Sequence, residues 1–245
     1  AEKCTGCTLC VKTCPFSAIA VTNKKAAIDL HRCALCGACV PACKFKAIFL
    51  DKPAAAAEKK DFSDHKGVWV FAEQKKGKVQ SVSFELIGKA RELADKLGTY
   101  VGAVLLGHNV DMAAQELIFA GADTVYVVDA PQLANFLDEA YSRIFIKLIQ
   151  KYKPEAVLSG ATIIGRSLMS RVAIKVYCGL TADCTGLDID PARKILLQTR
   201  PAFGGNIMAT IICPDHRPQM ATVRSNVFKK EKAGEKETGE VVTVK

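Results

Sequence analysis

From position 67 onward, short apolar runs alternate with segments in which apolar residues recur every three or four positions. The runs have the length of buried strands, and the segments between them have the period of helices. The pattern predicts strands at 68–71, 101–106, 125–128 and 156–158, and helices at 84–97, 111–119, 135–152 and 163–177. Four consecutive strand–helix units predict a parallel sheet with helices on both faces.

After Gly179 the pattern changes to short strands separated by tight turns, expected at 187–189, 195–199, 207–212 and 220–223. We expect these strands to extend the sheet in antiparallel fashion. The predicted fold class is therefore α/β: a Rossmann-like parallel sheet domain extended by antiparallel strands, preceded by a small α+β domain.

The small domain is predicted from the cysteines, since the first 43 residues hold eight of the chain's eleven, in one spacing written twice. The first run is Cys4, Cys7, Cys10 and Cys14, and the second is Cys33, Cys36, Cys39 and Cys43. Adding 29 to each position of the first run gives the second, and Phe16, Ala18 and Ile19 likewise recur as Phe45, Ala47 and Ile48. The N-terminal region is therefore a duplicated unit.

The spacing is that of bacterial ferredoxins, in which the fourth cysteine of a run ligates the other of two [4Fe–4S] clusters. Three thiolates at i, i+3 and i+6 reach three irons of one cluster, and the following residues carry the fourth cysteine past it. The expected ligand sets are Cys4, Cys7, Cys10 and Cys43 for one cluster, and Cys33, Cys36, Cys39 and Cys14 for the other. Gly6 and Gly37 supply backbone freedom where the loops wrap closely. Lys44 and Lys46 are either cations that raise a cluster's potential or ordinary solvated lysines.

Two other uses of cysteine are less compatible with this pattern. A disulfide scaffold requires an oxidising compartment, and the first residues do not resemble a signal peptide. A zinc site usually shows two CxxC pairs that give four ligands, and this region has eight cysteines. Oxygen-labile clusters, together with the scattered thiols Cys178, Cys184 and Cys213, favour a reducing cytoplasm; we expect those three thiols to be buried and structural.

Composition and charge narrow the class of protein. A hydrophobic content of 49% excludes a wholly disordered chain. No apolar stretch approaches the ~18 to 20 residues that a membrane span needs. The nearest, 144–149, is interrupted by Lys147, so no membrane span is expected. The formal charge is +9, and two oxidised clusters at about −2 each lower it to about +5. The C-terminal run mixes lysines with glutamates, which favours a solvated linker over a nucleic-acid-binding surface.

We expect four parts along the chain. Residues 1–52 form the domain with two [4Fe–4S] clusters, 53–66 are a linker, 67–228 form the α/β domain, and 229–245 are a second, charged linker.

The α/β domain shows neither a Gly-x-Gly-x-x-Gly motif nor a phosphate-binding P-loop. The segment 159–166, Ser-Gly-Ala-Thr-Ile-Ile-Gly-Arg, lies at a strand-to-helix transition, where ligands usually meet this fold; tight packing of the turn is the alternative. Arg200, followed by the glycine pair at 204–205, is a candidate for contact with a ring or an anion. We find no acid–base pair and predict no catalytic residue in this chain.

From Val68 onward, several motifs resemble the first domain of the alpha subunit of electron transfer flavoproteins. They are Val-Phe-Ala-Glu at 70–73, the helix at 84–94, Ser-Gly-Ala-Thr-x-x-Gly-Arg at 159–166, Gly-Leu-Thr-Ala-Asp-Cys at 179–184, Thr-Arg-Pro-Ala-Phe-Gly-Gly-Asn at 199–206, and Ala-Thr-Val-Arg at 221–224. The resemblance implies a beta subunit that holds AMP or, in electron-bifurcating members, FAD. It also implies that Arg200 lies near that flavin, and that a C-terminal domain with a further FAD is absent from this chain.

A ferredoxin domain in front of such a subunit resembles versions from anaerobes. These act with an acyl-CoA-dehydrogenase-like enoyl-CoA reductase, caffeyl-CoA reductase being one, or with a lactate dehydrogenase. The expected function is electron transfer in a flavin-based bifurcating complex, between NADH-reduced flavin, ferredoxin and that reductase. The alternatives are a non-bifurcating electron transfer flavoprotein with a ferredoxin docking module, and a redox-sensing iron–sulfur regulator. No nucleic acid or membrane partner is expected.

Overall fold

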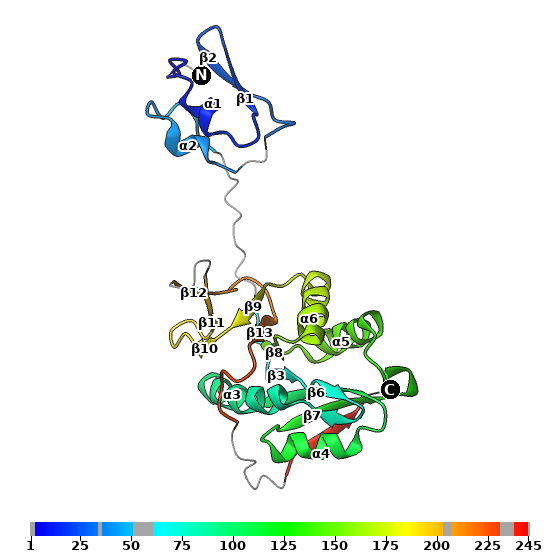
Figure 1. Ribbon diagram of the computed structural model, residues 1–245. Coiled ribbons are helices and arrows are strands. Elements are labelled where there is room, and N and C mark those ends of the chain that lie inside the picture. The colour runs from blue at the N-terminus through cyan, green and yellow to red at the C-terminus, as the bar shows by residue number, and fades with distance from the viewer. Residues whose placement is uncertain (1–2, 34–35, 51–60, 203–206, 231–237, 245) are drawn as a thin grey trace. The chain divides into compact units, whose positions relative to one another are not determined.

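The computed structural model describes residues 3–33, 36–50, 61–202, 207–230 and 238–244. The chain divides into two compact units, Ala1–Glu58 and Lys59–Lys245 (Figure 1).

The first unit contains two short helices and a β-hairpin. The helices are α1, Leu9–Thr13, and α2, Cys39–Ala42; the hairpin pairs β1, Ile19–Thr22, with β2, Lys25–Ile28, antiparallel. Asn23 and Lys24 at the hairpin turn have φ values of 50° and 57°, as a two-residue type I′ turn requires. Cys10, Ala18 and Ile19 are its buried apolar residues, so this unit has a very small core.

The second unit is built on a seven-stranded sheet in the order β14-β7-β6-β3-β8-β13-β9, with every neighbouring pair parallel. The central strand β3 pairs with β6 and β8 on its two sides, Val68 lying opposite both Val101 and Ala156. The strands are β3, Val68–Phe71; β6, Val101–Gly107; β7, Thr124–Asp129; β8, Ala156–Gly160; β9, Leu180–Cys184; β13, Gln219–Val223; and β14, Glu240–Thr243.

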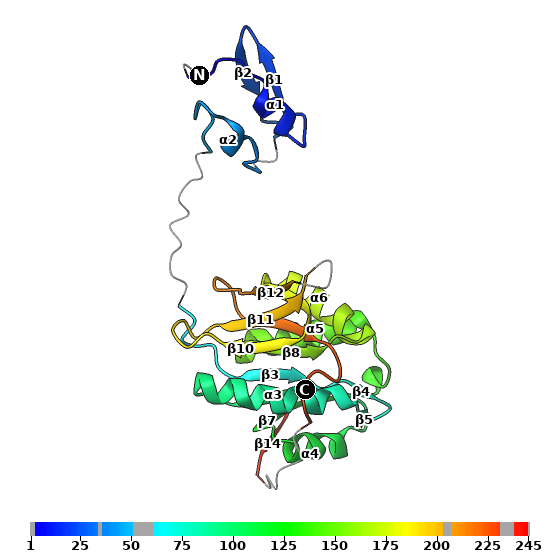
Figure 2. The ribbon, with the colours of Figure 1, turned by 60° about the vertical axis from the view of Figure 1, so that its left-hand side comes forward.

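Helices cover both faces of this sheet (Figures 1 and 2). The helices α3, Ser81–Leu97, and α4, Asp111–Phe119, pack in one hydrophobic core with Val68 and Val70. The helices α5, Asp138–Tyr152, and α6, Ile163–Val176, pack in the other core with Trp69 and Phe71. Because successive residues of a strand point to opposite faces, both cores draw on every central strand. A 3-10 turn, η1, Pro131–Leu133, and a hairpin of β4, Gln74–Lys75, and β5, Lys78–Val79, complete the loops.

The structure confirms the predicted fold class and corrects two details of the strand pairing. Three of the later strands form a sheet of their own, in which β11, Leu196–Pro201, pairs antiparallel with β10, Gly186–Ile189, and with β12, Met208–Ile211. The strand predicted at 220–223 is β13, which lies inside the parallel sheet between β8 and β9. Pairing between residues as distant as Gln219 and Ala156 leaves no local signal in the sequence.

Among the described strands of the second unit, four were not predicted: β4, β5, β9 and β14. Two helix starts also differ, and α3 begins at Ser81 instead of position 84. The sequence of β9, Leu-Thr-Ala-Asp-Cys, contains no apolar run, and its buried and half-buried positions do not alternate regularly. Within the stretch assigned to a charged linker, Glu240–Thr243 forms β14 and pairs with β7 at the sheet edge. The helix expected at 135–152 begins at Asp138, whose carboxylate and that of Glu139 favour a helix N-terminus. In the described part of the chain, no helix has the length and apolar character needed to cross a membrane.

Candidate functional site

Two cavities in the first unit are each lined by four cysteines. The first, of about 260 Å³, is lined by Cys4, Cys7, Cys10 and Cys43. The second, of about 240 Å³, is lined by Cys14, Cys33, Cys36 and Cys39. Each group therefore joins three cysteines of one run to the fourth cysteine of the other, which is the grouping that the spacing predicts for two clusters. Ligation itself stays a prediction.

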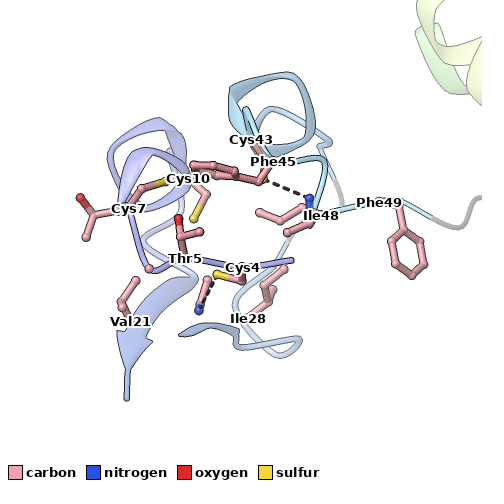
Figure 3. A pocket seen from close by; sticks show the side chains of 14 residues that line it. Cys4, Thr5, Cys7, Cys10, Val21, Ile28, Cys43, Phe45, Ile48 and Phe49 are labelled. Carbon is pink, nitrogen blue, oxygen red and sulfur yellow. Dashed lines mark hydrogen bonds between the residues drawn. The ribbon is translucent and has the colours of Figure 1, made fainter. Parts of the chain in front are cut away.

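The cysteines of the first cavity come from three segments of the chain (Figure 3). Cys4 and Cys7 lie in the loop before α1, Cys10 lies in α1, and Cys43 directly follows α2. The loop needs glycine at position 6, where φ is 72° and a Cβ atom would lie 2.8 Å from the carbonyl oxygen of Lys24. The β1–β2 hairpin thus lies directly against the loop that carries Cys4 and Cys7.

Backbone amides donate hydrogen bonds to three of the cysteine sulfurs. The N–H of Ala18 lies 3.3 Å from Cys14 Sγ, and the N–H of Ala47 lies 3.2 Å from Cys43 Sγ, four residues along the chain in both cases. The N–H of Ala26, in β2, lies 3.4 Å from Cys4 Sγ. Hydrogen bonds from these amides hold the pKa values of the Cys4 and Cys43 thiols below the ordinary value, which favours the thiolate that metals bind.

The second cavity is built from the corresponding positions of the other run. Cys39 is the first residue of α2, as Cys10 lies in α1, and burial raises the pKa of both thiols. Gly37, with a φ of 76°, lies 29 positions after Thr8 and is its counterpart in the second repeat; Thr8 has a φ of 63°. The duplication is therefore visible in the backbone as well as in the sequence.

The arrangement of the described residues fits a polynuclear cluster better than a single ion. Among them, no group of three His, Cys, Asp or Glu side chains converges closely enough to hold one metal ion. Four cysteines around a cavity, with amide donors to their sulfurs, instead match the ligands and hydrogen bonds of a [4Fe–4S] centre.

Arg200, the other predicted site residue, lies in β11 of the second unit, opposite Ala209, and is half-buried. Its charge acts on Cys184, although burial dominates there and raises the pKa of that thiol to about 11. The residues 203–206, which contain the neighbouring glycine pair, lie outside the described part of the chain. The role of Arg200 therefore stays a prediction.

The turn at 159–166 joins β8 to α6, as expected. The Thr162 hydroxyl oxygen accepts a hydrogen bond from the Gly165 N–H at 2.9 Å and donates one to Glu73 Oε2 at 2.6 Å, so Thr162 caps the helix. A Cβ atom at Gly165 would lie 2.0 Å from the Gly160 carbonyl oxygen. Packing alone therefore requires the small residue at position 165, although a cavity of about 530 Å³ opens beside Glu73 and Thr162.

Two features of the second unit were not seen from the sequence. Arg166 forms an ion pair of 3.0 Å with Asp183. Arg217 pairs at 2.6 Å with the buried Glu155, whose pKa is raised by that burial. Of the three scattered thiols expected to be buried, Cys184 is buried, whereas Cys178 and Cys213 are half-buried.

A family model described as a 4Fe-4S dicluster domain matches residues 3–47. A model described as an electron transfer flavoprotein domain matches residues 68–245. The chain belongs to the electron transfer flavoprotein family. The resemblance inferred from the sequence, an alpha subunit of that family with an N-terminal iron–sulfur domain, is confirmed.

Curated members of the family support this. The electron transfer flavoprotein subunit alpha of Thermoanaerobacterium thermosaccharolyticum is 55% identical over 180 residues, covering 74% of this chain and 54% of that protein. The acryloyl-CoA reductase electron transfer subunit beta of Anaerotignum propionicum is 43% identical, covering 69% and 52%. The lactate dehydrogenase (NAD(+),ferredoxin) subunit LctC of Acetobacterium woodii is 40% identical, covering 88% and 50%. The chain spans about half the length of these relatives.

Proposed function

We propose that this electron transfer flavoprotein subunit passes single electrons between flavin and two [4Fe–4S] clusters within a flavin-based electron-bifurcating complex. The observation that carries the proposal is the pair of four-cysteine cavities in a chain whose remainder is an electron transfer flavoprotein domain. Each cluster accepts and releases one electron, whereas a flavin exchanges two, so the combination suits a machine that splits electron pairs.

In this proposal the cysteines hold the clusters, and the second unit meets a flavin held mainly by other parts of the complex. FAD would lie at the interface with a beta subunit, and a further FAD would lie in a C-terminal domain outside these residues. Arg200 would place its cation beside the first flavin and favour the anionic reduced form. The Arg200→Gln variant should then shift that flavin's midpoint potential to more negative values in a redox titration of the complex.

The proposed partners are an electron transfer flavoprotein beta subunit, ferredoxin, and an acyl-CoA-dehydrogenase-like reductase or a lactate dehydrogenase. Two relatives carry names that refer to an acryloyl-CoA reductase and to a lactate dehydrogenase with NAD(+) and ferredoxin. The second unit also exposes large apolar side chains on and beside α6, with Ile163 at 90%, Ile174 at 73% and Tyr177 at 82%. Such exposure supports a surface that another subunit covers.

The test uses the complex purified with its native partner subunits. Ferredoxin, NADH and the high-potential acceptor, an enoyl-CoA or pyruvate, are combined, and ferredoxin reduction is followed by absorbance. Bifurcation predicts rapid ferredoxin reduction only when NADH and the acceptor are both present. The Cys7→Ser and Cys36→Ser variants, each lacking a ligand of one cluster, should slow it. Ferredoxin that stays oxidised in the full mixture would refute bifurcation.

A non-bifurcating electron transfer flavoprotein remains the alternative. It predicts that the acceptor is reduced by NADH at the same rate with and without ferredoxin. A redox-sensing regulator would instead work without flavin, so flavin absorbance near ~450 nm in the isolated complex would exclude it.

A further inference from the structure

The two cysteine cavities differ in the residues that complete their walls. The first contains the hydroxyl-bearing Thr5 and Thr8 and the small residues Gly6, Ala26 and Ala47, besides the larger apolar residues Val21, Ile28, Phe45, Ile48 and Phe49. Among the described residues, the second has no hydroxyl in its wall: besides cysteine it is lined by Phe16, Ile19, Ile28, Leu30, Gly37, Ala38, Val40, Ile48, Phe49 and Leu50, and Ile28, Ile48 and Phe49 line both cavities. Each cavity therefore has four cysteines, but the wall around them is more polar in the first cavity than in the second.

The β1–β2 hairpin brings two lysines close to the wall of the first cavity. Ala26 lines that cavity and donates its N–H to Cys4 Sγ, and the exposed Lys25 directly precedes it in the chain. Lys24 also lies next to this cavity, because its carbonyl oxygen packs against Gly6 in the cavity wall. In the second repeat, the positions that correspond to Asn23, Lys24 and Lys25 are Lys52, Pro53 and Ala54, which lie outside the described residues.

The residues that follow the fourth cysteines differ in charge in the same sense. Lys3 and Arg32 precede the first cysteine of each run and so offset each other. Lys44 follows Cys43 of the first cavity, whereas Pro15 follows Cys14 of the second. Lys46 has Ser17 as its counterpart, and these two residues share a φ of 49°.

We propose, resting on the cluster assignment above, that Lys25, Thr5 and Thr8 give the cluster of the first cavity the higher reduction potential of the two. Reduction adds one negative charge to a cluster. Nearby cations and hydrogen-bond donors stabilise that charge, whereas an apolar, water-excluding wall opposes it. An electron in this domain therefore rests on the first site. It passes there from the second, which is oxidised as the first is reduced, and no bond or proton moves.

The test is a redox titration of the whole complex, followed by electron paramagnetic resonance. The Cys36→Ser variant retains the first cluster and the Cys7→Ser variant retains the second, which assigns each signal. The expected result is a higher midpoint potential for the first cluster. The Lys25→Ala variant should shift that potential to more negative values and leave the second unchanged. Its control is Lys12→Ala, which removes an exposed lysine of α1 that, like Lys25, is not part of either cavity wall but lies outside the β1–β2 hairpin.

A reciprocal pair of variants tests the polarity of the walls. Thr5→Val keeps the side-chain shape and removes a hydroxyl, so it should lower the potential of the first cluster. Val40→Thr adds a hydroxyl to the second cavity and should raise the potential of the second cluster. Equal potentials in the two cysteine variants, or the same shift from Lys25→Ala as from Lys12→Ala, would overturn the proposal. Iron far below about eight atoms per chain would instead remove the cluster assignment on which it rests.

Discussion

At the scale of single residues, the fourth cysteine of each run shows how the two repeats depend on each other. Cys14 ends the first run, yet it lines the cavity of Cys33, Cys36 and Cys39, and Cys43 likewise lines the cavity of Cys4, Cys7 and Cys10. Both accept an amide hydrogen bond from the residue four positions on. Neither repeat can therefore complete a four-cysteine site alone.

This crossing predicts the effect of removing one thiol. In Cys14→Ser, the cluster of Cys33, Cys36 and Cys39 should be lost or converted, while that of Cys4, Cys7 and Cys10 remains, because serine is a much poorer ligand for iron. Cys43→Ser is the matched variant and should have the opposite effect. Iron analysis and electron paramagnetic resonance of the complex measure both. If Cys14→Ser removed the signal that Cys7→Ser also removes, the crossed assignment would be wrong.

A second prediction at this scale concerns Gly6. An alanine there places a Cβ atom 2.8 Å from the Lys24 carbonyl oxygen, at a φ of 72°. We expect Gly6→Ala to destabilise the first unit by about 1–3 kcal/mol, because the left-handed backbone and the backbone contact are both strained.

Gly37→Ala is the control for Gly6→Ala. Its φ of 76° imposes a similar backbone strain, but the nearest atom to its Cβ is a Leu50 methyl at 3.8 Å. Loss of cluster absorbance during denaturation by urea measures both variants. If Gly37→Ala lost its clusters at lower urea than Gly6→Ala, close packing of the hairpin would not be the reason for glycine at position 6.

At the scale of elements, the turn between β8 and α6 shows what local sequence can and cannot reveal. Thr162 caps α6 and also donates a hydrogen bond to Glu73, which follows β3. Replacing Thr162 by alanine should lower the free energy of unfolding of the second unit by about 1–2 kcal/mol, because the cap is lost.

The control for the cap is Ser170→Ala, at an exposed position inside the same helix, where alanine is the better helix former. It should leave the unfolding midpoint in urea unchanged or slightly higher. A midpoint for Thr162→Ala equal to that of the unaltered chain would show that the cap contributes little.

The same elements explain how far sequence reasoning reached. The four strand–helix units were predicted because amphipathic periods are local, and α4 was predicted with its observed bounds, Asp111–Phe119. The antiparallel pairing predicted for the strand at 220–223 was wrong, because the strands that β13 pairs with, β8 and β9, are distant from it in the sequence. The grouping of the eight cysteines follows from spacing alone. The polarity difference between their cavities does not, since it depends on where the β1–β2 hairpin folds back.

At the scale of the whole molecule, each of the two units is stabilised in a different way. The second unit contains two extended hydrophobic cores, and every residue of both belongs to it. The first unit buries few apolar residues and depends on its proposed clusters, as small domains often depend on metals. The stability of one unit should therefore not require that of the other.

The single tryptophan makes this independence measurable. Trp69 is fully buried in the core of the second unit, with its ring centroid 4.6 Å from that of Tyr126, so its fluorescence reports on that unit alone. Cluster absorbance reports on the first unit alone. Removing iron with a chelator under reducing conditions should abolish the absorbance and leave the urea midpoint of Trp69 fluorescence unchanged. The converse should hold as well: Thr162→Ala should lower the urea midpoint of Trp69 fluorescence and leave the urea concentration at which cluster absorbance is lost unchanged. A Trp69 midpoint that falls when iron is removed would show that the clusters also stabilise the flavoprotein domain.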